Sequence, residues 1–552
     1  MELSDSSKKP VSRGVQLLLV VLFIAGAFAV YGGTLGHEFL YNWDDNVYVT
    51  GNEAIRGFSP AHLRSAVSSF FVGNYAPLHI VSYMMDYTLW GLNPRGYLLV
   101  NLLLHAVNAI LAFRLFLLID GRLPVALAAA ILFLVHPVQV ESVAWISERK
   151  TLLAMLFFLL SLHSYARYSR ETGNRRRWYF LALLAFVAAL LSKAVVVVLP
   201  LVLIAYDWQQ GGQARGWKGL PDKIPFFALS AILTAVTLLS QRSADGLTEY
   251  AGGTPLTSAM TMMPVFARYL GKIFWPVNLG PIYNPPLKIA PDGEVLLAML
   301  LFAATVASAL LLLHRRRVAG FALSVFLLGL LPVAHIFPIA TLMQDRYLYF
   351  PLLGFALFLA ALTTDAAGFL AGARGGRIWI VILLLLALPL GAAAQRQSGI
   401  WRNALTLWSH TANNEPGSKQ AWLMLAITLQ DRKDFPGAEE AYLRLLSIAP
   451  RDSKGLNGIG ILYGEKGDLD RSLDYLRRAV AVEPNNPETL VNFGYTAFLK
   501  GMLDESRDAF NRAVELSPGE ISRLLPTLLE IARRQNDKDE VARLEALART
   551  SR

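Results

Sequence analysis

The sequence predicts an all-α protein in two parts, a polytopic membrane core of about 11 helices followed by a helical-repeat solenoid. Three observations support this prediction. Of the 552 residues, 54% are hydrophobic and only 17% are charged, whereas about a quarter of an average soluble domain is charged. The long apolar runs are confined to residues 1–395, and residues 396–552 have the mixed composition of soluble helices. In that second part, prolines recur at a fixed interval of 34 residues.

The membrane core is predicted from runs that approach the roughly 20 apolar residues needed to cross a bilayer. The eleven runs are 14–33, 97–118, 123–136, 151–166, 178–192, 194–206, 225–240, 294–313, 318–334, 348–364 and 377–394. The first run follows Lys8, Lys9 and Arg13 and lacks a clear cleavage site, so we expect an uncleaved helix. Prolines interrupt the apolar stretch 261–279, which is predicted to be interfacial or re-entrant, and 75–90 forms an amphipathic stretch.

The distribution of positive charge predicts the orientation of the core. If the N-terminus is cytoplasmic, the segments on that side carry more than three times the density of Lys and Arg found opposite. The triple-arginine runs 175–177 and 315–317 contribute most. Eleven crossings then place the C-terminal part outside, and we expect a bacterial inner membrane with that part in the periplasm. Membrane topology also explains the net charge of +10, so we expect no nucleic-acid partner.

The C-terminal part has the period of the tetratricopeptide repeat (TPR). Pro416, Pro450, Pro484 and Pro518 each close the second helix of a unit. The predicted elements are a half-repeat at 400–416, repeats at 417–450, 451–484 and 485–518, and cap helices at 519–549. Grooves of such solenoids bind extended peptides or partner helices, which predicts a protein or peptide partner.

Four separate loops on the predicted outer side carry ionisable residues near membrane depth, where such residues are costly and usually functional. They are Asp44 and Asp45; His136, Glu141, Arg149 and Lys150; Lys193; and Asp345, Arg346 and Tyr347. Each has an alternative interpretation: the acidic pair as solvated or capping residues, 149–150 as snorkelling anchors, 345–346 as a local ion pair. Lys193 needs an anionic partner. Asn101, His105 and Asn108 share one helical face and are predicted to form interhelical hydrogen bonds.

This combination of residue types indicates a particular chemistry. A carboxylate can remove the proton of a hydroxyl, and cations can hold a phosphate and stabilise its charge as it leaves. At the outer leaflet, both suit a donor whose phosphate is linked to a lipid. The sequence contains no P-loop, dinucleotide-binding glycine motif, HExxH or GxSxG. No ligand cluster indicates a divalent metal, which stays open as an alternative, and no other cofactor is expected.

The same residues resemble those of the transmembrane and TPR-containing (TMTC-like) O-mannosyltransferases and their bacterial relatives, in the GT-C glycosyltransferase superfamily. The resemblance runs through Trp43-Asp44-Asp45, the block from His136 to Lys150, Lys193, and the Asp345-Arg346-Tyr347 segment, and then the repeats. It implies a GT-C fold and an inverting transfer from a polyprenyl-phosphate sugar, mannose in eukaryotic members, to a hydroxyl.

The resemblance also implies roles. Asp44 would be the general base and Asp45 would orient it or the acceptor. Arg149, Lys150, Lys193 and Arg346 would bind the donor phosphate. His136, Glu141, Asp345 and Tyr347 would support the site.

Other functions stay open at this stage. Family members often carry many more repeats, so the acceptor is a protein, a peptide or a glycan lipid. A non-enzymatic TPR scaffold for envelope assembly would tolerate neutralisation of the loop charges. A lipid-sugar transporter would favour ionisable residues in mid-span and broken helices in paired halves.

Overall fold

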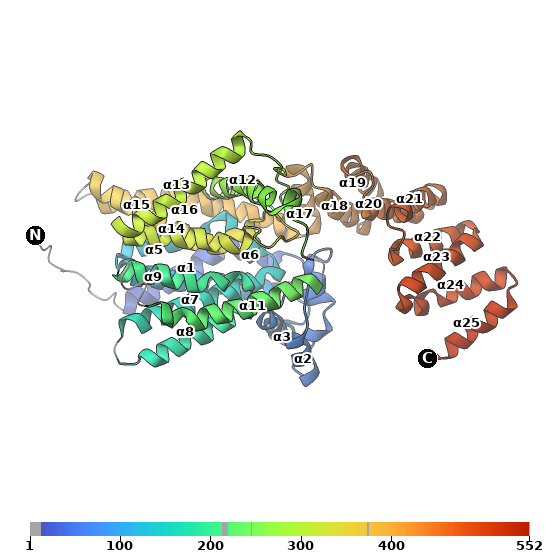
Figure 1. The fold of residues 1–552 in the computed structure, drawn as a ribbon, viewed down its shortest axis with the longest axis horizontal. Helices are drawn as coiled ribbons and strands as arrows, with labels where there is room; N and C mark the ends of the chain where they lie inside the picture. The colour runs from blue at the N-terminus through green and yellow to red at the C-terminus, as the bar shows by residue number, and fades with distance from the viewer. Residues whose placement is uncertain (1–12, 172, 212–218, 244–245, 372–374, 551–552) are drawn as a thin grey trace, which may run out of the picture. The chain divides into compact units, whose positions relative to one another are not determined.

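The computed structural model describes residues 13–171, 173–211, 219–243, 246–371 and 375–550 (Figure 1). Lys8 and Lys9, which contribute to the predicted orientation, lie outside this range. Within it, every regular element is helical, which confirms the predicted all-α class. Two compact units meet between Leu407 and Trp408. That point lies within helix α17 (Ala404–Asn414), whereas the prediction divided the chain at residue 395, where the apolar runs end.

Each of the eleven predicted runs coincides with a helix. These are α1 (Arg13–Tyr31), α4 (Pro94–Asp120), α5 (Leu123–Val135), α7 (Arg149–Arg170), α8 (Arg175–Leu190), α9 (Leu199–Gly211), α11 (Ile224–Ser243), α13 (Gly293–Arg315), α14 (Arg317–Leu330), α15 (Tyr349–Ala371) and α16 (Gly375–Ser398). The remaining helices of the core are α2 (Pro60–Ser68), α3 (Pro77–Trp90), α6 (Val140–Ala144) and α12 (Pro255–Phe274).

Not all of these eleven helices are long and apolar enough to cross a membrane alone. Among the described residues, seven helices are long and apolar enough to cross a membrane, or eight if α5 and the bent segment after it form one span. The difference has a physical cause. With 13, 16 and 14 residues, α5, α8 and α14 are short for a hydrocarbon core about 30 Å thick. Helix α7 has 22 residues, but Arg149 and Lys150 begin it and two arginines occupy its last turn.

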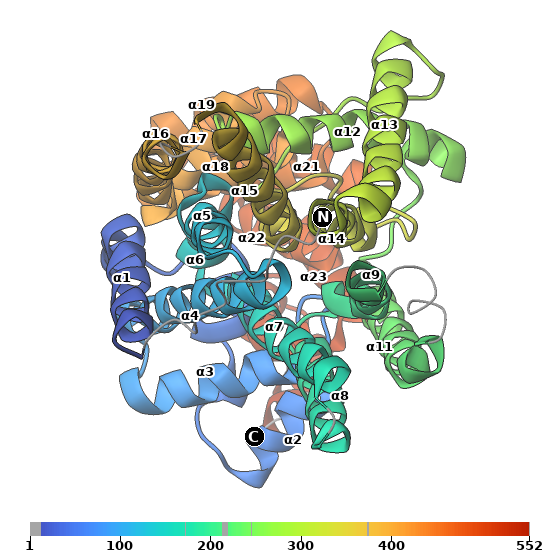
Figure 2. The same ribbon diagram turned by 90° about the vertical axis from the view of Figure 1, so that its left-hand side faces the viewer.

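Local sequence determines where α4, the central helix of the core, begins and ends. The Asn93 side chain accepts a hydrogen bond from the Arg95 N–H at 3.1 Å, and Pro94 occupies the first helical position. Gly121 follows the last turn in the left-handed conformation, with φ of 82°, which glycine adopts without strain. Figure 2 shows α4 packed among α1, α5 and α7.

Polar side chains on one face of α4 hold this bundle together, as predicted. Asn101 donates to the Trp145 carbonyl at 3.2 Å, and Asn108 donates to the Leu152 carbonyl at 3.0 Å. The two ring nitrogens of His105 lie 2.8 Å from the Tyr349 hydroxyl and 3.0 Å from the Leu134 carbonyl. In an apolar environment, such bonds fix the register of neighbouring helices.

The C-terminal unit is a series of antiparallel helix pairs. They are α18 (Lys419–Asp431) with α19 (Phe435–Ile448), α20 (Ser453–Glu465) with α21 (Leu469–Val482), α22 (Pro487–Lys500) with α23 (Leu503–Leu516), and α24 (Ile521–Arg534) with α25 (Lys538–Thr550). Small residues lie where paired helices approach closely. A Cβ on Gly494 would lie 2.6 Å from Phe510, and one on Gly460 would lie 2.7 Å from Leu476. Packing between neighbours therefore requires glycine at both positions.

Candidate active site

The candidate site is built on a break in the membrane core. After α5 the chain bends by 54° through the short helix Pro137–Gln139 and α6, then passes through the helical turn Ile146–Glu148 into α7. Proline has no N–H to continue the helix, so Pro137 favours this break. The break buries residues 136–150 at the end of α5 and the start of α7. The turn Asp345–Leu348, which precedes α15, contacts the same segment.

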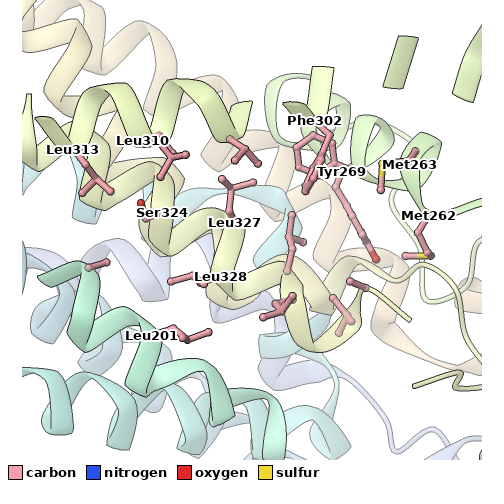
Figure 3. Close-up of a pocket in the computed structure, with 18 of the residues that line it drawn as sticks. Leu201, Met262, Met263, Tyr269, Phe302, Leu310, Leu313, Ser324, Leu327 and Leu328 are labelled. Carbon is pink, nitrogen blue, oxygen red and sulfur yellow. The ribbon is translucent and has the colours of Figure 1, made fainter. Parts of the chain in front are cut away.

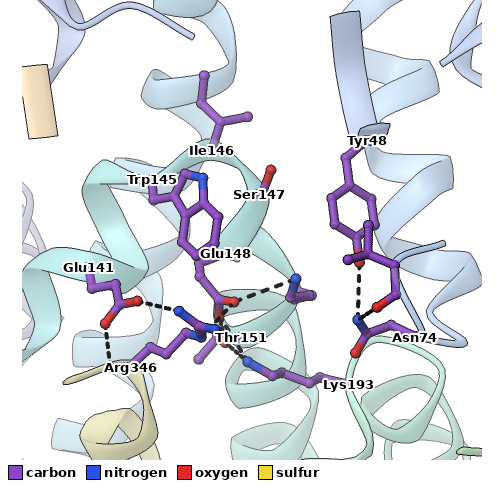
Figure 4. Close-up of polar contacts among 12 residues, drawn as sticks. Tyr48, Asn74, Glu141, Trp145, Ile146, Ser147, Glu148, Thr151, Lys193 and Arg346 are labelled. Atoms are coloured by element: carbon purple, nitrogen blue, oxygen red, sulfur yellow. Dashed lines mark hydrogen bonds and ion pairs between the residues drawn. The ribbon is translucent and has the colours of Figure 1, made fainter. Parts of the chain in front are cut away.

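Glu148 is the centre of a cluster of cations (Figure 4). Its carboxylate lies 2.9 Å from the Lys193 Nζ, 3.3 Å from the Arg346 Nε and 3.5 Å from the Lys150 Nζ, and it accepts a hydrogen bond from the Thr151 hydroxyl at 2.5 Å. Burial alone would raise the pKa of Glu148, but the three cations outweigh burial and hold that pKa below its usual value. Glu148 is therefore a fixed negative charge that brings three cations together.

Arg346 is held by a second carboxylate, that of Glu141. The Arg346 Nη1 donates to Glu141 Oε1 at 2.5 Å, and the Arg346 backbone N–H donates to Oε2 at 2.8 Å. The guanidinium also lies over the indole of Trp145, 5.2 Å from the ring centroid. Thus Arg346 is fixed in both backbone and side chain, yet 13% of its side chain stays exposed.

Asp45 is buried and anchors the first loop. Its carboxylate accepts hydrogen bonds from the Leu40 N–H at 2.9 Å, from the Ser147 N–H at 3.1 Å and from the Ser147 hydroxyl. Burial raises the pKa of Asp45 to about 6, although these hydrogen bonds act in the opposite direction. The side chain therefore ties the first loop to the turn that carries Glu148.

The neighbouring Asp44 is placed differently. It is half-buried, and its side chain accepts no hydrogen bond from the part of the chain that the structure describes. Its charge nevertheless acts on Lys150 and on Tyr48, whose ring centroid lies 4.6 Å from the Lys150 Nζ. The Asp44 carboxylate can thus accept a hydrogen bond or a proton next to the cation cluster.

Arg149, which was predicted to bind phosphate, is not brought into this cluster. Its side chain has no exposed surface and pairs with Asp86. It also donates to the Asn101 side chain at 2.8 Å and to the Tyr97 carbonyl at 2.7 Å, and its guanidinium lies over the Tyr83 ring at 4.7 Å. These contacts hold α3 and α4 to the start of α7.

Three further predicted residues hold the surrounding segments. Because the His136 Nδ1 accepts from the Val138 N–H at 3.3 Å, its Nε2 donates to the Ile273 carbonyl of α12 at 2.9 Å. Asp345 accepts from the Gly280 N–H at 2.7 Å and from the Tyr283 hydroxyl at 2.8 Å. The Tyr347 hydroxyl is 2.8 Å from the Thr341 hydroxyl.

The membrane core also contains a large apolar cavity, whose lining side chains are drawn in Figure 3. It has a volume of about 520 Å³ and is formed by α9, α12, α13 and α14. Leucine, methionine and phenylalanine side chains dominate its lining, among them Met262, Phe302 and Leu328. The lining residue Tyr269 accepts a hydrogen bond from the Gln344 N–H at 3.2 Å, in the segment that carries Arg346. The cavity therefore borders the cation cluster through one residue.

Comparisons with known proteins bear on both parts of the chain. A family model for the tetratricopeptide repeat matches residues 457–521. The protein O-mannosyl-transferase TMTC3 of Homo sapiens is 22% identical over 510 residues, which are 81% of this chain and 53% of the human protein. The protein O-mannosyl-transferase F38B6.6 of Caenorhabditis elegans is 24% identical over 472 residues, which are 80% of this chain and 64% of the nematode protein.

The chain is similar to these protein O-mannosyl-transferases over most of its length. It spans less than two thirds of the length of these two relatives. Among solved structures, ArnT from Cupriavidus metallidurans bound to undecaprenyl phosphate matches 93% of this chain and 80% of its own, with 13% identity and a TM-score of 0.39.

Glu148 is the residue of this candidate site that the sequence alone did not reveal. It lies inside the recognised block from His136 to Lys150, but nothing in a single sequence distinguishes it from a solvated carboxylate. Thr151 donates to Glu148 and Ser147 donates to Asp45, and both residues were missed for the same reason. The available signal was the position of Glu148 two residues before Lys150.

In the segments that the structure describes, no group of three or more His, Asp or Glu side chains is arranged to hold a metal ion. The carboxylates of Glu141 and Glu148 are instead paired with cations, and that of Asp45 accepts hydrogen bonds. Glu141 and Glu148 neutralise part of the charge of Lys150, Lys193 and Arg346. The cluster as a whole keeps one excess positive charge, which suits an anionic ligand.

Proposed function

We propose that this chain is a membrane glycosyltransferase that transfers a sugar from a polyprenyl-phosphate donor to a hydroxyl group of an envelope acceptor. One observation carries the proposal: Lys150, Lys193 and Arg346, from three distant segments, converge on Glu148, and the charge of Asp44 acts on Lys150. The names of the relatives, protein O-mannosyl-transferases, favour mannose as the sugar and a protein as the acceptor.

The cation cluster would bind the donor phosphate. Lys193 and Arg346 keep 17% and 13% of their side chains exposed, whereas Lys150 is buried behind them. Glu141 and Glu148 hold the cations in place before any ligand arrives. Such preorganisation stabilises charge that develops during the reaction without a further cost of reorienting the groups.

The apolar cavity would hold the lipid of the donor. A polyprenyl chain needs a hydrocarbon environment, and α9, α12, α13 and α14 provide one of about 520 Å³. Because Tyr269 joins the cavity wall to Gln344, a chain in the cavity would bring its phosphate close to Arg346. The sugar would then extend toward the first loop and Asp44.

In the proposed reaction the acceptor hydroxyl oxygen attacks the anomeric carbon, and the bond from that carbon to the phosphate oxygen breaks. The electron pair of that bond stays on the phosphate, whose new charge interacts with Arg346 and Lys193. Asp44 takes the proton of the hydroxyl as general base. Attack from the face opposite the phosphate inverts the anomeric configuration.

We place this site on the non-cytoplasmic face of a bacterial inner membrane, since the distribution of Lys and Arg favours a cytoplasmic N-terminus. The repeats would lie in the periplasm and would present the acceptor, a protein or peptide, through their groove.

The test offers the purified full-length chain, in nanodiscs, a panel of polyprenyl-phosphate sugars with peptide and protein acceptors, and detects transfer by mass spectrometry. The wild type should glycosylate at least one acceptor, and Asp44→Asn should lower the rate at least about 100-fold. The matched control is Glu53→Gln in the same loop, where the carboxylate side chain is 88% exposed.

Two results would overturn the proposal. If Asp44→Asn transfers sugar at the rate of the wild type, Asp44 is not the base. If the wild type transfers nothing from any donor, and its cellular role survives neutralisation of Lys193 and Arg346, the chain is a scaffold.

A further inference from the structure

We propose that the membrane core has a second lipid site, unrelated to the proposed transfer, in which an anionic phospholipid is bound by Arg114 and Arg167. The site is a cavity of about 620 Å³ between α1, α4, α7 and α8. Its lining is Gln16, Leu19, Val20, Phe23, Ile110, Leu111, Phe113, Arg114, Leu117, Leu118, Leu160, His163, Ser164, Arg167 and Trp178.

The cavity lies at the opposite end of α7 from the candidate active site. Glu148 and Lys150 flank the first residue of α7, whereas Arg167 lies in its last turn. With a rise of 1.5 Å per residue, the two ends are roughly 27 Å apart. Figure 2 shows α1, α4, α7 and α8 at this end, and each of them packs against the next. The cavity therefore lies in the leaflet opposite the candidate active site.

The charges around this cavity favour an anion. Two arginines line it, and none of its lining residues is acidic. Arg114 lies in a membrane helix and forms no ion pair with any described residue. A cation at such a depth is costly without a counter-ion. Arg167 is bound to Glu171 at 3.2 Å and lies over the Trp178 ring at 5.0 Å, which holds it at the rim.

A hydrogen-bond donor or acceptor inside the cavity is also unused. The Nδ1 of His163 is 3.1 Å from the Leu159 carbonyl, but its Nε2 is buried and has no partner in the described part of the chain. His163 and Ser164 both line the cavity near Arg167 in α7. A phosphodiester group would supply the missing anionic partner of Arg114 and would accept a hydrogen bond from the Ser164 hydroxyl, while a hydroxyl of a glycerol headgroup would donate to the His163 Nε2.

The rest of the lining identifies the ligand as a lipid. Ten of the fifteen lining residues are aliphatic or aromatic, contributed by all four helices. A soluble phosphate or nucleotide would leave this surface without contact. An anionic phospholipid of the surrounding bilayer would place its phosphate at Arg114 and Arg167 and its acyl chains along Leu19, Phe23 and Leu160.

The test measures thermal unfolding of the full-length chain in detergent micelles, titrated with dioleoyl phosphatidylglycerol or dioleoyl phosphatidylcholine. We expect phosphatidylglycerol to raise the unfolding temperature of the wild type by several degrees and phosphatidylcholine to have little effect. The double variant Arg114→Gln/Arg167→Gln should bind phosphatidylglycerol roughly ten- to thirty-fold more weakly. Each shift is compared with the same variant in lipid-free micelles, so a change in basal stability cancels.

Two matched variants sharpen the result. Arg315→Gln/Arg317→Gln also removes two exposed positive charges, from α13 and α14 outside the cavity, and should keep the wild-type response. Leu160→Trp keeps both arginines but fills the cavity, and should weaken the response, which tests the site even if the double arginine variant does not fold.

Three outcomes overturn the proposal. The first is an equal response to phosphatidylcholine and phosphatidylglycerol. The second is that the Arg315→Gln/Arg317→Gln control loses as much of the response to phosphatidylglycerol as Arg114→Gln/Arg167→Gln does. The third is the same stabilisation by inorganic phosphate alone, which would indicate a site for a free anion.

Discussion

The indole of Trp401 stacks on that of Trp145, with ring centroids 5.8 Å apart and ring planes inclined by 25°. Trp401 belongs to the short helix Gly399–Arg402, which directly follows α16. The guanidinium of Arg346 in turn lies over the ring of Trp145. The segment after the last membrane helix is therefore part of the wall of the candidate site.

Replacing Trp401 with alanine should destabilise the membrane core. Both indoles are buried, and truncation of a buried tryptophan costs about 3 to 5 kcal/mol because the space it leaves is only partly refilled. The measurement is the unfolding free energy of the full-length chain in detergent. The control is Trp275→Ala, because that side chain is 73% exposed and should matter little. An equal loss in both variants would contradict the stacking as the cause.

Replacing Glu148 with glutamine should also destabilise the core, by about 3 to 5 kcal/mol, because Lys150, Lys193 and Arg346 would then face one another without their shared carboxylate. The double variant Glu148→Gln/Lys193→Met should lose less than the sum of the two single variants, by about 1 to 3 kcal/mol.

The matched cycle for this prediction uses Arg477 and Glu505, an exposed pair with N···O of 2.9 Å in the repeats. Its coupling energy should stay below about 1 kcal/mol. Additive effects at Glu148 and Lys193 would show that the cluster is not electrostatically coupled.

The raised pKa of Asp45 predicts that the stability of the protein depends on pH. Its pKa in the folded protein is about 6, above the value of about 3.9 in an unfolded chain. Between these pH values the folded state binds more protons than the unfolded state, so stability falls as pH rises through the window. Below pH 4 the group is protonated in both states and has no effect. Relative to Asp45→Asn, the wild type should therefore lose up to about 3 kcal/mol between pH 4 and pH 7.

The measurement is the difference in unfolding free energy between wild type and Asp45→Asn at each pH, which cancels the contributions of groups that titrate alike in both proteins. A difference that is flat with pH, or that grows in favour of the wild type toward pH 7, would show that the folded pKa of Asp45 is not raised.

Gly494→Ala should destabilise the repeats by about 1 to 3 kcal/mol, because the added methyl group would lie 2.6 Å from the buried ring of Phe510. Hydrogen exchange of the full-length chain reports on this locally, and α22 and α23 should lose protection before the membrane core does. Gly519→Ala is the control, since nothing lies within 4 Å of its new methyl group. Unchanged protection in Gly494→Ala would mean that the two helices can move apart at little cost.

The helices were predictable because their signals are local. Each apolar run became a helix, and α20 and α21 fall inside the predicted repeat 451–484 because proline and small residues recur at the period of a helix pair. The number of crossings was not predictable in this way. It depends on whether short helices such as α8 and α14 cross alone, and on the 54° bend after α5.

The candidate site was predictable in its residue types but not in its pairings. Arg149 and Lys150 are neighbours in sequence, yet successive side chains of a helix point about 100° apart, so the first pairs with Asp86 and the second with Glu148. A single sequence does not reveal such partners, because the pairing is decided by the packing of α3 and α4 against α7.

The pairing of Glu141 with Arg346 spans 205 residues of the chain. At about 5 to 20 residues per second, the ribosome needs roughly 10 to 40 s to make the second partner after the first. During that interval a nascent chain would carry the Glu141 carboxylate at membrane depth without the cation that neutralises it. Until Arg346 is inserted, water, lipid head groups or the insertion machinery must therefore solvate the unpaired carboxylate in the early helices.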